Sequence, residues 1–400
     1  MNFRRVFTCF LLLFVAYLLS AQPKNESVSG YLFETAIDLP STNIKDQHKS
    51  STCWSYSAMS FLESEILRMG GTPLDLSEMF VVWNCYRAKA DRYVRMHGNT
   101  NFNPGGAFHD ALWVIKNFGI VPEDAYKGLT IGNDKPVHGE MDDALKSYVD
   151  GIVTNKNKKL SSVWYSTFTD MLDNYLGVVP DKFSYKGKEY SPKSFAAEVV
   201  KINPNDYVEI GSYTHHPFYS TFILEIPDNW LWQEIYNVPI AEMTEIIDYA
   251  LMNGYTVAWG ADISDKGFAT KSKGVAVIPE VDYSTMTDTD IARWQGLDED
   301  KQLEELYKLE KPTKEKTITQ EMRQTDFDNY TSTDDHGMHI VGIAKDQNGT
   351  AYYKVKNSWG DYNDYKGFFY VSKPYVALRT IDFMVHKNGI PKHIRTKLGL

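Results

Sequence analysis

One cysteine in the sequence lies where its thiol can act as a nucleophile. Cys53 begins a segment, continuing to Met69, in which apolar residues recur every three or four positions before two glycines follow. This spacing predicts an amphipathic helix with Cys53 in its first turn. Unpaired backbone N–H groups and the helix dipole favour negative charge there, so we expect the thiolate to form readily. A small buried cysteine at the start of a helix is the alternative interpretation.

A glutamine six residues before Cys53 favours the catalytic interpretation. The side-chain amide of Gln47 can reach back across the turn towards the sulfur. Together with the backbone N–H of Cys53, it can donate hydrogen bonds to the oxyanion that forms when a thiolate attacks a carbonyl. Gln47 and Cys53 are therefore candidate catalytic residues.

A base for this thiol is expected near the other end of the chain. Residues 335–344 and 352–356 have the composition of two strands, with the turn pair Asn348-Gly349 between them. This pattern predicts a β-hairpin that brings a histidine next to Asn357. Residues three apart on a strand face opposite ways, so His336 and His339 cannot share the role, and from the spacing alone both are candidates.

Together these segments resemble the active site of the papain-like cysteine peptidases. Residues 47–54 match the family's pattern of glutamine, five further residues and then Cys-Trp at the head of a long helix. Residues 335–342 match the family's Asp-His pattern, with a glycine six positions after the histidine, only when His336 is the catalytic residue. Residues 357–360 read Asn-Ser-Trp-Gly, as they do in the family.

The resemblance implies a role for each residue of these motifs. His336 takes the proton of the Cys53 thiol, and Asn357 orients the imidazole. His339 is then structural, bonded to a neighbouring carbonyl or partly solvated. The supporting aromatic residues are Trp54, beside the cysteine, and Trp359, which shields the contact between histidine and asparagine from water.

The chemistry implied by these roles is peptide hydrolysis through a thioester. The thiolate attacks the peptide carbonyl, Gln47 and the Cys53 amide stabilise the oxyanion, and His336 returns a proton to the leaving amine. Water then hydrolyses the thioester. Sulfur and imidazole suffice for these steps, so no cofactor is expected. No metal site is predicted either, because His215 and His216 are adjacent in sequence and their side chains should diverge.

Within the family the sequence resembles the bleomycin hydrolase and aminopeptidase C branch. Ser50 stands where many papain-like enzymes have a disulfide-forming cysteine, so we expect Cys85 to be a buried thiol. His336 follows Cys53 by 283 residues, against about 130 to 150 in compact papain-like enzymes. The difference indicates a large inserted region, as in that branch.

A pair of glycines is the candidate contact for substrate. Gly105 and Gly106 precede a predicted helix, and glycines allow another backbone to approach closely. In papain-like enzymes the equivalent pair contacts the substrate main chain, which implies the same for Gly106 with Gly105. An ordinary turn is the alternative.

The fold implied is α+β, a papain-like arrangement of two lobes with the cleft between them and a large inserted region. We expect the following boundaries: a signal peptide at 1–21, an N-terminal segment and helical lobe with Cys53 at 22–134, an inserted and mainly helical region at 135–255, and a β-rich lobe with His336, Asn357 and the C-terminal tail at 256–400.

The first residues predict export. Two arginines precede an uncharged apolar run, residues 6–19, that ends near Ala21, as in a secretory signal peptide. The run is too short to span a membrane, so we expect a periplasmic or extracellular protein without a membrane anchor after cleavage. The formal net charge of −10 excludes a nucleic-acid binder held by bulk charge.

The sequence therefore predicts an exported cysteine peptidase that acts on peptides. The branch is known for hexamers in which the chain's own C-terminus lies in the cleft, and the resemblance implies an aminopeptidase and a homo-oligomer. An endopeptidase of the same fold and a catalytically silent peptide-binding homologue are the alternatives. Acyl transfer to amines instead of water also stays open.

Overall fold

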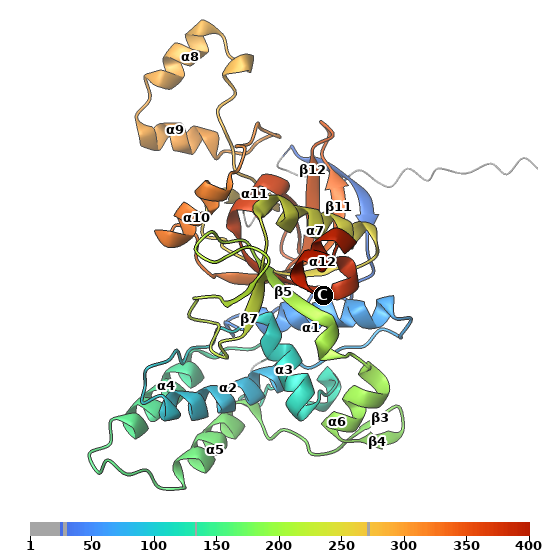
Figure 1. Cartoon of the computed structure of the whole chain (residues 1–400), viewed down its shortest axis with the longest axis vertical. Helices are drawn as coiled ribbons and strands as arrows, with labels where there is room; N and C mark the ends of the chain where they lie inside the picture. Colours follow the sequence, from blue (N-terminus) through green and yellow to red (C-terminus); the bar gives the residue numbers. More distant parts are fainter. Residues whose placement is uncertain (1–24, 27–29, 133, 270–272) are drawn as a thin grey trace, which may run out of the picture.

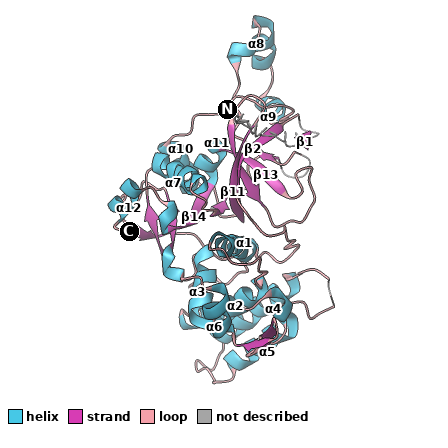
Figure 2. Ribbon diagram, turned by 90° about the vertical axis from the view of Figure 1, so that its right-hand side faces the viewer, coloured by secondary structure: helices cyan, strands magenta, loops and turns pink. Residues whose placement is uncertain are grey.

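The computed structural model describes residues 25–26, 30–132, 134–269 and 273–400. The predicted signal peptide, 1–21, lies outside the described residues. The described chain forms a helical half and a sheet half, with helix α1 (Cys53–Arg68) between them (Figures 1 and 2). This arrangement confirms the predicted α+β class with a helical lobe and a β-rich lobe.

Helix α1 begins at Cys53, as the spacing predicts, and ends at Arg68. Its residues are buried along nearly the whole length, because the helix packs against the sheet on one side and against other helices on the other. Gly70 follows with a positive φ of 81°, a conformation that glycine adopts without strain. The other helices are α2 (Glu78–Arg95), α3 (Phe108–Phe118), α4 (Gly139–Val153), α5 (Trp164–Leu176), α6 (Pro192–Phe195), α7 (Ile240–Met252), α8 (Asp288–Gln295), α9 (Glu299–Leu306), α10 (Gln320–Asp328), α11 (Lys373–Arg379) and α12 (Lys392–Leu398).

A twelve-stranded sheet forms the other half of the described chain. Its order is β6-β7-β5-β14-β8-β11-β12-β13-β10-β9, β2 pairs with the second part of β11, and β1 pairs with β2. A separate hairpin joins β3 and β4. The strands are β1 (Asn25–Glu26), β2 (Leu32–Asp38), β3 (Phe183–Tyr185), β4 (Lys188–Tyr190), β5 (Tyr207–Gly211), β6 (Thr221–Ile223), β7 (Glu234–Asn237), β8 (Val257–Ala261), β9 (Phe268–Ala269), β10 (Val275–Ala276), β11 (His336–Lys345), β12 (Ala351–Lys356), β13 (Phe368–Ser372) and β14 (Thr380–His386).

The predicted hairpin is confirmed by the pairing of β11 with β12. The two strands are antiparallel, and His339 lies opposite Lys356. His336 begins β11, and Asn357 directly follows β12, so both stand at the same end of the hairpin. On its other side the first part of β11 pairs with β8, which places His336 in the interior of the sheet and not at an edge.

A glycine allows α1 to lie close to β11. A Cβ atom on Gly337 would come within 2.6 Å of Ser57 Oγ and 3.2 Å of Trp54 Cα, both on α1. Any larger residue would therefore push the helix away from the strand. Because Gly337 directly follows His336, this close approach also brings the N-terminal end of α1 to the histidine.

The region from 135 to 255 contributes to both halves of the molecule. Helices α4 and α5 pack with α1 and α2 in one hydrophobic cluster, whereas β5, β6 and β7 extend the sheet beyond β14. The boundaries predicted for this region stay a prediction. Helices α8 and α9 project away from the body (Figure 1), and neither has a buried residue.

The last helix, α12, packs against α7. Leu398 of α12 is buried in the same cluster as Ile246 and Ile247 of α7, and Leu400 packs against that cluster. Lys397 forms an ion pair with Glu242 at 2.5 Å. Among the described residues, none of the helices is both long enough and apolar enough to cross a bilayer.

Candidate active site

The start of α1 joins the candidate nucleophile to the sheet. Cys53 is a free, half-buried cysteine at the first position of the helix, and the backbone N–H of Gly337 donates a hydrogen bond to its sulfur. Cys53 and His336 line the same pocket. The sulfur therefore lies beside the residue that follows the candidate base.

The histidine and the asparagine are in direct contact. His336 Nε2 lies 2.8 Å from Asn357 Oδ1, and the backbone N–H of Ser358 donates to the same oxygen at 2.8 Å. Because Oδ1 is thereby fixed as an acceptor, Nε2 of the imidazole carries the hydrogen. The other ring nitrogen, Nδ1, is then unprotonated in the neutral ring and can accept a proton from the thiol.

An aromatic ring covers this contact. The rings of Trp359 and His336 are stacked with centroids 4.7 Å apart, and both His336 and Asn357 are buried. The stacking is the arrangement that the shielding role requires, because it keeps water from competing for the hydrogen bond between the two side chains.

Gln47 is held beside the same segment by two hydrogen bonds. Its backbone N–H donates to the Ser358 carbonyl at 2.8 Å, and Ser358 Oγ donates to Gln47 Oε1 at 2.5 Å. The second contact uses the oxygen of the side-chain amide, so its Nε2 is the group left to donate elsewhere. As the first residue of a helix, Cys53 also has a backbone N–H without an acceptor inside the helix. Gln47 Nε2 and the Cys53 backbone N–H are therefore both free to act as the two donors expected for an oxyanion.

Electrostatics in the ligand-free pocket differ from the sequence-based expectation. Burial raises the pKa of the Cys53 thiol to about 12, and the charges of Asp334 and Asp228 contribute to the shift. Burial also lowers the pKa of His336 to about 4. Burial is the largest cause of this shift, so the position at the helix start does not by itself make the Cys53 thiolate easy to form.

His339 lies in the core behind the pocket. It is fully buried, and its Nδ1 lies 2.9 Å from Ser60 Oγ of α1. The expected bond to a carbonyl or partial solvation is wrong, since the partner is a hydroxyl on the helix that packs over β11. Burial holds the pKa of His339 well below its ordinary value. His339 does not line the pocket that contains Cys53.

The glycine pair lies at one edge of this pocket. A Cβ on Gly106 would come within 2.8 Å of the Trp54 ring, and a Cβ on Gly105 would come within 2.0 Å of Asp228 Oδ2. The indole of Trp54 donates to the Pro104 carbonyl at 3.0 Å, which fixes the glycine segment against α1. Gly106 lines the pocket and Gly105 stands behind it, against Asp228.

Sequence reasoning missed the acidic lining of the pocket. Asp228, Asp334 and Asp382 come from three separate segments and line the pocket with Cys53. Only Asp334 has a local signal, since it stands two residues before His336. Asp228 lies in the loop between β6 and β7 and Asp382 in β14, and nothing in either segment indicates proximity to the thiol.

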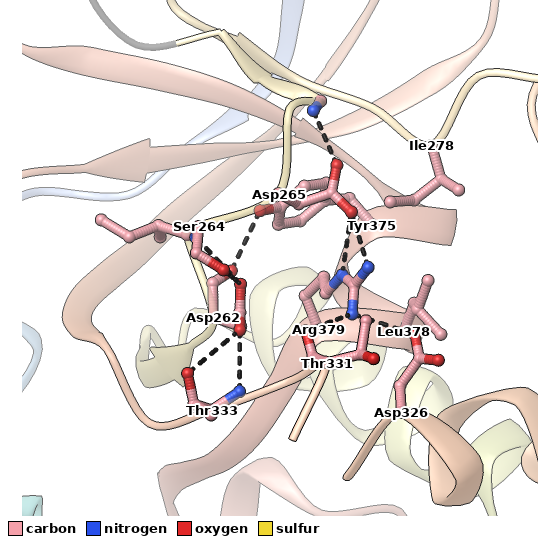
Figure 3. Close-up of polar contacts among 12 residues, drawn as sticks. Asp262, Ser264, Asp265, Ile278, Asp326, Thr331, Thr333, Tyr375, Leu378 and Arg379 are labelled. Carbon is pink, nitrogen blue, oxygen red and sulfur yellow. Dashed lines mark hydrogen bonds and ion pairs between the residues drawn. The ribbon is translucent and has the colours of Figure 1, made fainter. Parts of the chain in front are cut away.

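A buried network holds the loop that leads into β11. Arg379 donates to Asp265 Oδ2 at 2.6 Å, to Asp326 Oδ2 at 2.9 Å and to the Thr331 carbonyl at 3.3 Å (Figure 3). Asp262 accepts from the Thr333 backbone N–H at 2.7 Å (Figure 3). These contacts fix residues 331–333, directly before Asp334 and the histidine.

The two adjacent histidines converge instead of diverging. The ring centroids of His215 and His216 are 4.5 Å apart, and both Nε2 atoms contact the Glu225 carboxylate. The prediction of diverging side chains is therefore wrong. The donor set nevertheless fits a metal ion poorly, because the Gln324 amide donates to Nδ1 of His215 at 2.9 Å and so leaves the ring hydrogen on Nε2. Among the described residues, the second cysteine is Cys85, a buried free thiol, as predicted.

Comparisons with known proteins agree with the fold. A family model described as "Papain family cysteine protease" matches residues 36–173, and one described as "Peptidase C1-like family" matches residues 303–399. The first range contains Gln47, Cys53 and the glycine pair, and the second contains His336 and Asn357. Together with the geometry, these matches identify the chain as a papain-like cysteine peptidase.

Relatives are similar over almost the whole chain. Aminopeptidase G of Lactobacillus delbrueckii subsp. lactis is 23% identical, with 92% of this chain and 86% of the relative covered. Aminopeptidase C of Lactococcus lactis subsp. lactis (strain IL1403) is 21% identical, with 93% and 86% covered. The crystal structure of PepW from Lactobacillus rhamnosis has a TM-score of 0.66 at 18% identity and covers 92% of this chain and 84% of that structure. The structural likeness supports the papain-like fold.

Replacing the two histidines separately should distinguish their roles. We expect Cys53→Ala and His336→Ala to abolish peptide turnover, because each removes a reacting group. His339→Ala should keep most of kcat per folded chain but lower Tm, because it opens a cavity in the core and removes the contact with Ser60. Rates on a fluorogenic peptide and thermal unfolding measure the two effects. An active His336→Ala enzyme and an inactive His339→Ala enzyme would reverse the assignment.

Gln47→Ala should lower kcat by about 10²- to 10³-fold, the usual effect of removing one oxyanion donor. Alkylation of Cys53 by iodoacetamide should still reach one equivalent, since no oxyanion forms in that reaction. Ser358→Ala is the matched control: it releases the Gln47 amide but keeps the donor, so its loss of kcat should be smaller. Full kcat in Gln47→Ala would remove this residue from the catalytic group.

Proposed function

We propose that this chain is an exported cysteine aminopeptidase of the bleomycin hydrolase type. The observation that carries the proposal is the pocket that contains both Cys53 and His336, with the imidazole fixed by Asn357. The relatives similar to this chain over about nine-tenths of its length are named aminopeptidases, which supports removal of residues from the N-terminal end of a peptide.

The contacts in the pocket define how the reaction proceeds. Nδ1 of His336 takes the proton of the Cys53 thiol as the sulfur attacks the carbonyl carbon of the substrate. The oxyanion receives hydrogen bonds from Gln47 Nε2 and the Cys53 backbone N–H. The imidazolium then protonates the leaving amine, the C–N bond breaks and a thioester remains. His336 next removes a proton from water, which attacks the thioester and releases the carboxylate and the free thiol.

Two of the alternatives can be compared with the structure. A silent peptide-binding homologue would have no need of an imidazole whose tautomer is fixed by Asn357 or of a glutamine amide fixed by Ser358. An endopeptidase needs a cleft open on both sides of the scissile bond, whereas here Asp228 stands against Gly105 at one end. The first observation favours an active peptidase over a silent homologue, and the second favours an aminopeptidase over an endopeptidase.

Export and assembly are also part of the proposal. Export rests on the composition of residues 1–21, and the N-terminal residue of the mature protein checks it. Assembly into a hexamer rests on the resemblance to the bleomycin hydrolase branch, and light scattering of the processed protein checks it.

A pair of reporters tests the aminopeptidase activity. Phenylalanine 7-amido-4-methylcoumarin has a free α-amine, and we expect its kcat/KM to be at least about 10-fold higher than that of its N-acetylated form. A site that binds the ammonium group leaves its own polar groups unpaired when the acetylated reporter binds, which lowers kcat/KM by one or more powers of ten. Cys53→Ala supplies the background rate. Equal rates on the two reporters would remove the aminopeptidase and favour an endopeptidase.

A further inference from the structure

The charged side chains that line the pocket of the nucleophile are all acidic. Cys53 and His336 share it with four carboxylates, and among its described lining residues there is no lysine or arginine. Asp335 already accepts hydrogen bonds from Thr333 Oγ1 and from the backbone N–H of Ile263. The other three, Asp228, Asp334 and Asp382, form what we call the acidic pocket wall.

Asp228 closes the glycine edge of the pocket. Its carboxylate is so close to Gly105 that a Cβ there would come within 2.0 Å of Oδ2. The amide of Asn103 donates to Asp228 Oδ1 at 3.0 Å and holds the side chain in this position. A peptide main chain that pairs with Gly106 therefore meets a carboxylate one residue further on. A substrate whose N-terminus ends at this point fits, and a longer one meets the loop between β6 and β7.

The other two members of the wall accept no side-chain hydrogen bond, although the positive charges of His109 and Arg323 act on Asp382. Asp382 is 6% exposed, and its carboxylate packs against Gly260, where a Cβ would come within 2.6 Å of Oδ1. No side chain of the described residues bonds or pairs with Asp334 or Asp382. Burial raises the pKa of both carboxyls well above the ordinary value, and repulsion adds to it, from Asp228 at Asp334 and from Glu209 at Asp382. A bound cation would relieve this repulsion.

The described C-terminal residues lie against α7 and do not line the pocket. Among the described residues, none after Asp382 lines the pocket, and Leu400 packs against the cluster around α7. The group that meets the N-terminal end of a substrate is therefore sought among the residues that line the pocket.

We propose that Asp228, Asp334 and Asp382 form the binding site for the α-ammonium group of the peptide substrate, with Asp228 also blocking longer chains. This proposal rests on the proposed aminopeptidase function and assigns its specificity to the inserted loop and to β14. The ligand is a primary ammonium group next to the scissile residue. A basic side chain one residue before the scissile residue has the same chemistry and is tested below as the other source.

Occupation of this site also changes the nucleophile. The charges of Asp334 and Asp228 raise the pKa of the Cys53 thiol. An ammonium group between them offsets that effect, so the thiolate forms more readily when the correct substrate is bound. Removing one carboxylate should then have opposite effects on two measurements: weaker recognition of free amines and faster alkylation of the empty enzyme.

The test compares Asp228→Asn and Asp334→Asn with wild type on three reporters: phenylalanine 7-amido-4-methylcoumarin, its N-acetylated form, and N-acetyl-lysyl-phenylalanine 7-amido-4-methylcoumarin. Glu225→Gln is the matched control, since it removes a carboxylate from the same loop outside the pocket. Rates are divided by the equivalents of Cys53 that iodoacetamide alkylates, so only folded sites are counted. Should Asp228→Asn leave no alkylatable site, Asp334→Asn carries the test.

We expect each pocket variant to lower kcat/KM on the free-amine reporter by about 10- to 100-fold, the effect of losing one charge-assisted hydrogen bond. The rate of alkylation by iodoacetamide at neutral pH should rise in the same variants. Rates on the N-acetylated reporter should not fall in the pocket variants, because that reporter has no ammonium group, and all rates of Glu225→Gln should stay at the wild-type value.

Three outcomes overturn the proposal, each in a distinct way. Unchanged preference for the free amine in both pocket variants removes the anchor and leaves the aminopeptidase intact. Equal wild-type rates on the free-amine and N-acetylated reporters remove the aminopeptidase as well. An acetylated lysyl reporter that is cleaved as fast as the free-amine reporter, and that also depends on Asp228, assigns the site to a basic side chain instead.

Discussion

The site depends on how closely helix α1 approaches strand β11. Gly337 has no side chain, and its backbone N–H donates to the sulfur of Cys53, so the first turn of the helix meets the strand at the residue after His336. The catalytic pair is therefore a consequence of lobe packing, and the remaining contacts orient groups that this packing has already brought together.

The contacts around the pair come from segments that are distant in sequence. Ser358 contacts both groups: its backbone N–H donates to Asn357 Oδ1, and its hydroxyl donates to Gln47 Oε1. One residue thus orients both the group that holds the base and the group that receives the oxyanion. Loss of register between residues 45–47 and 358–360 would disturb both functions together.

Local patterns predicted the elements of the site, and long-range contacts decided its electrostatics. The helix at Cys53 and the hairpin that carries His336 follow from spacing and turn chemistry, which act over a few residues. The high pKa of the thiol depends on burial and on Asp228 and Asp334, which reach the pocket from other parts of the chain. The hydroxyl partner of His339 likewise comes from α1, 279 residues away in sequence. Such contacts have no periodic signal in the sequence.

The inserted region contributes a residue to the pocket and strands to the sheet. Its loop between β6 and β7 carries Asp228 to the glycine edge, and its strands β5 and β7 extend the sheet beyond β14, the strand of Asp382. Specificity and catalysis are therefore divided between segments: the helix and the hairpin supply the reacting groups, and the insertion limits what reaches them.

The most direct test of the central contact is chemical cross-linking of the sulfur to the imidazole. A bifunctional reagent such as 1,3-dibromoacetone bridges a thiol and a ring nitrogen only when both are within a few ångströms. The account predicts that peptide mapping finds one bridge, between Cys53 and His336, at one equivalent of reagent. Alkylation of Cys53 without a bridge, or a bridge to another histidine, would contradict the account.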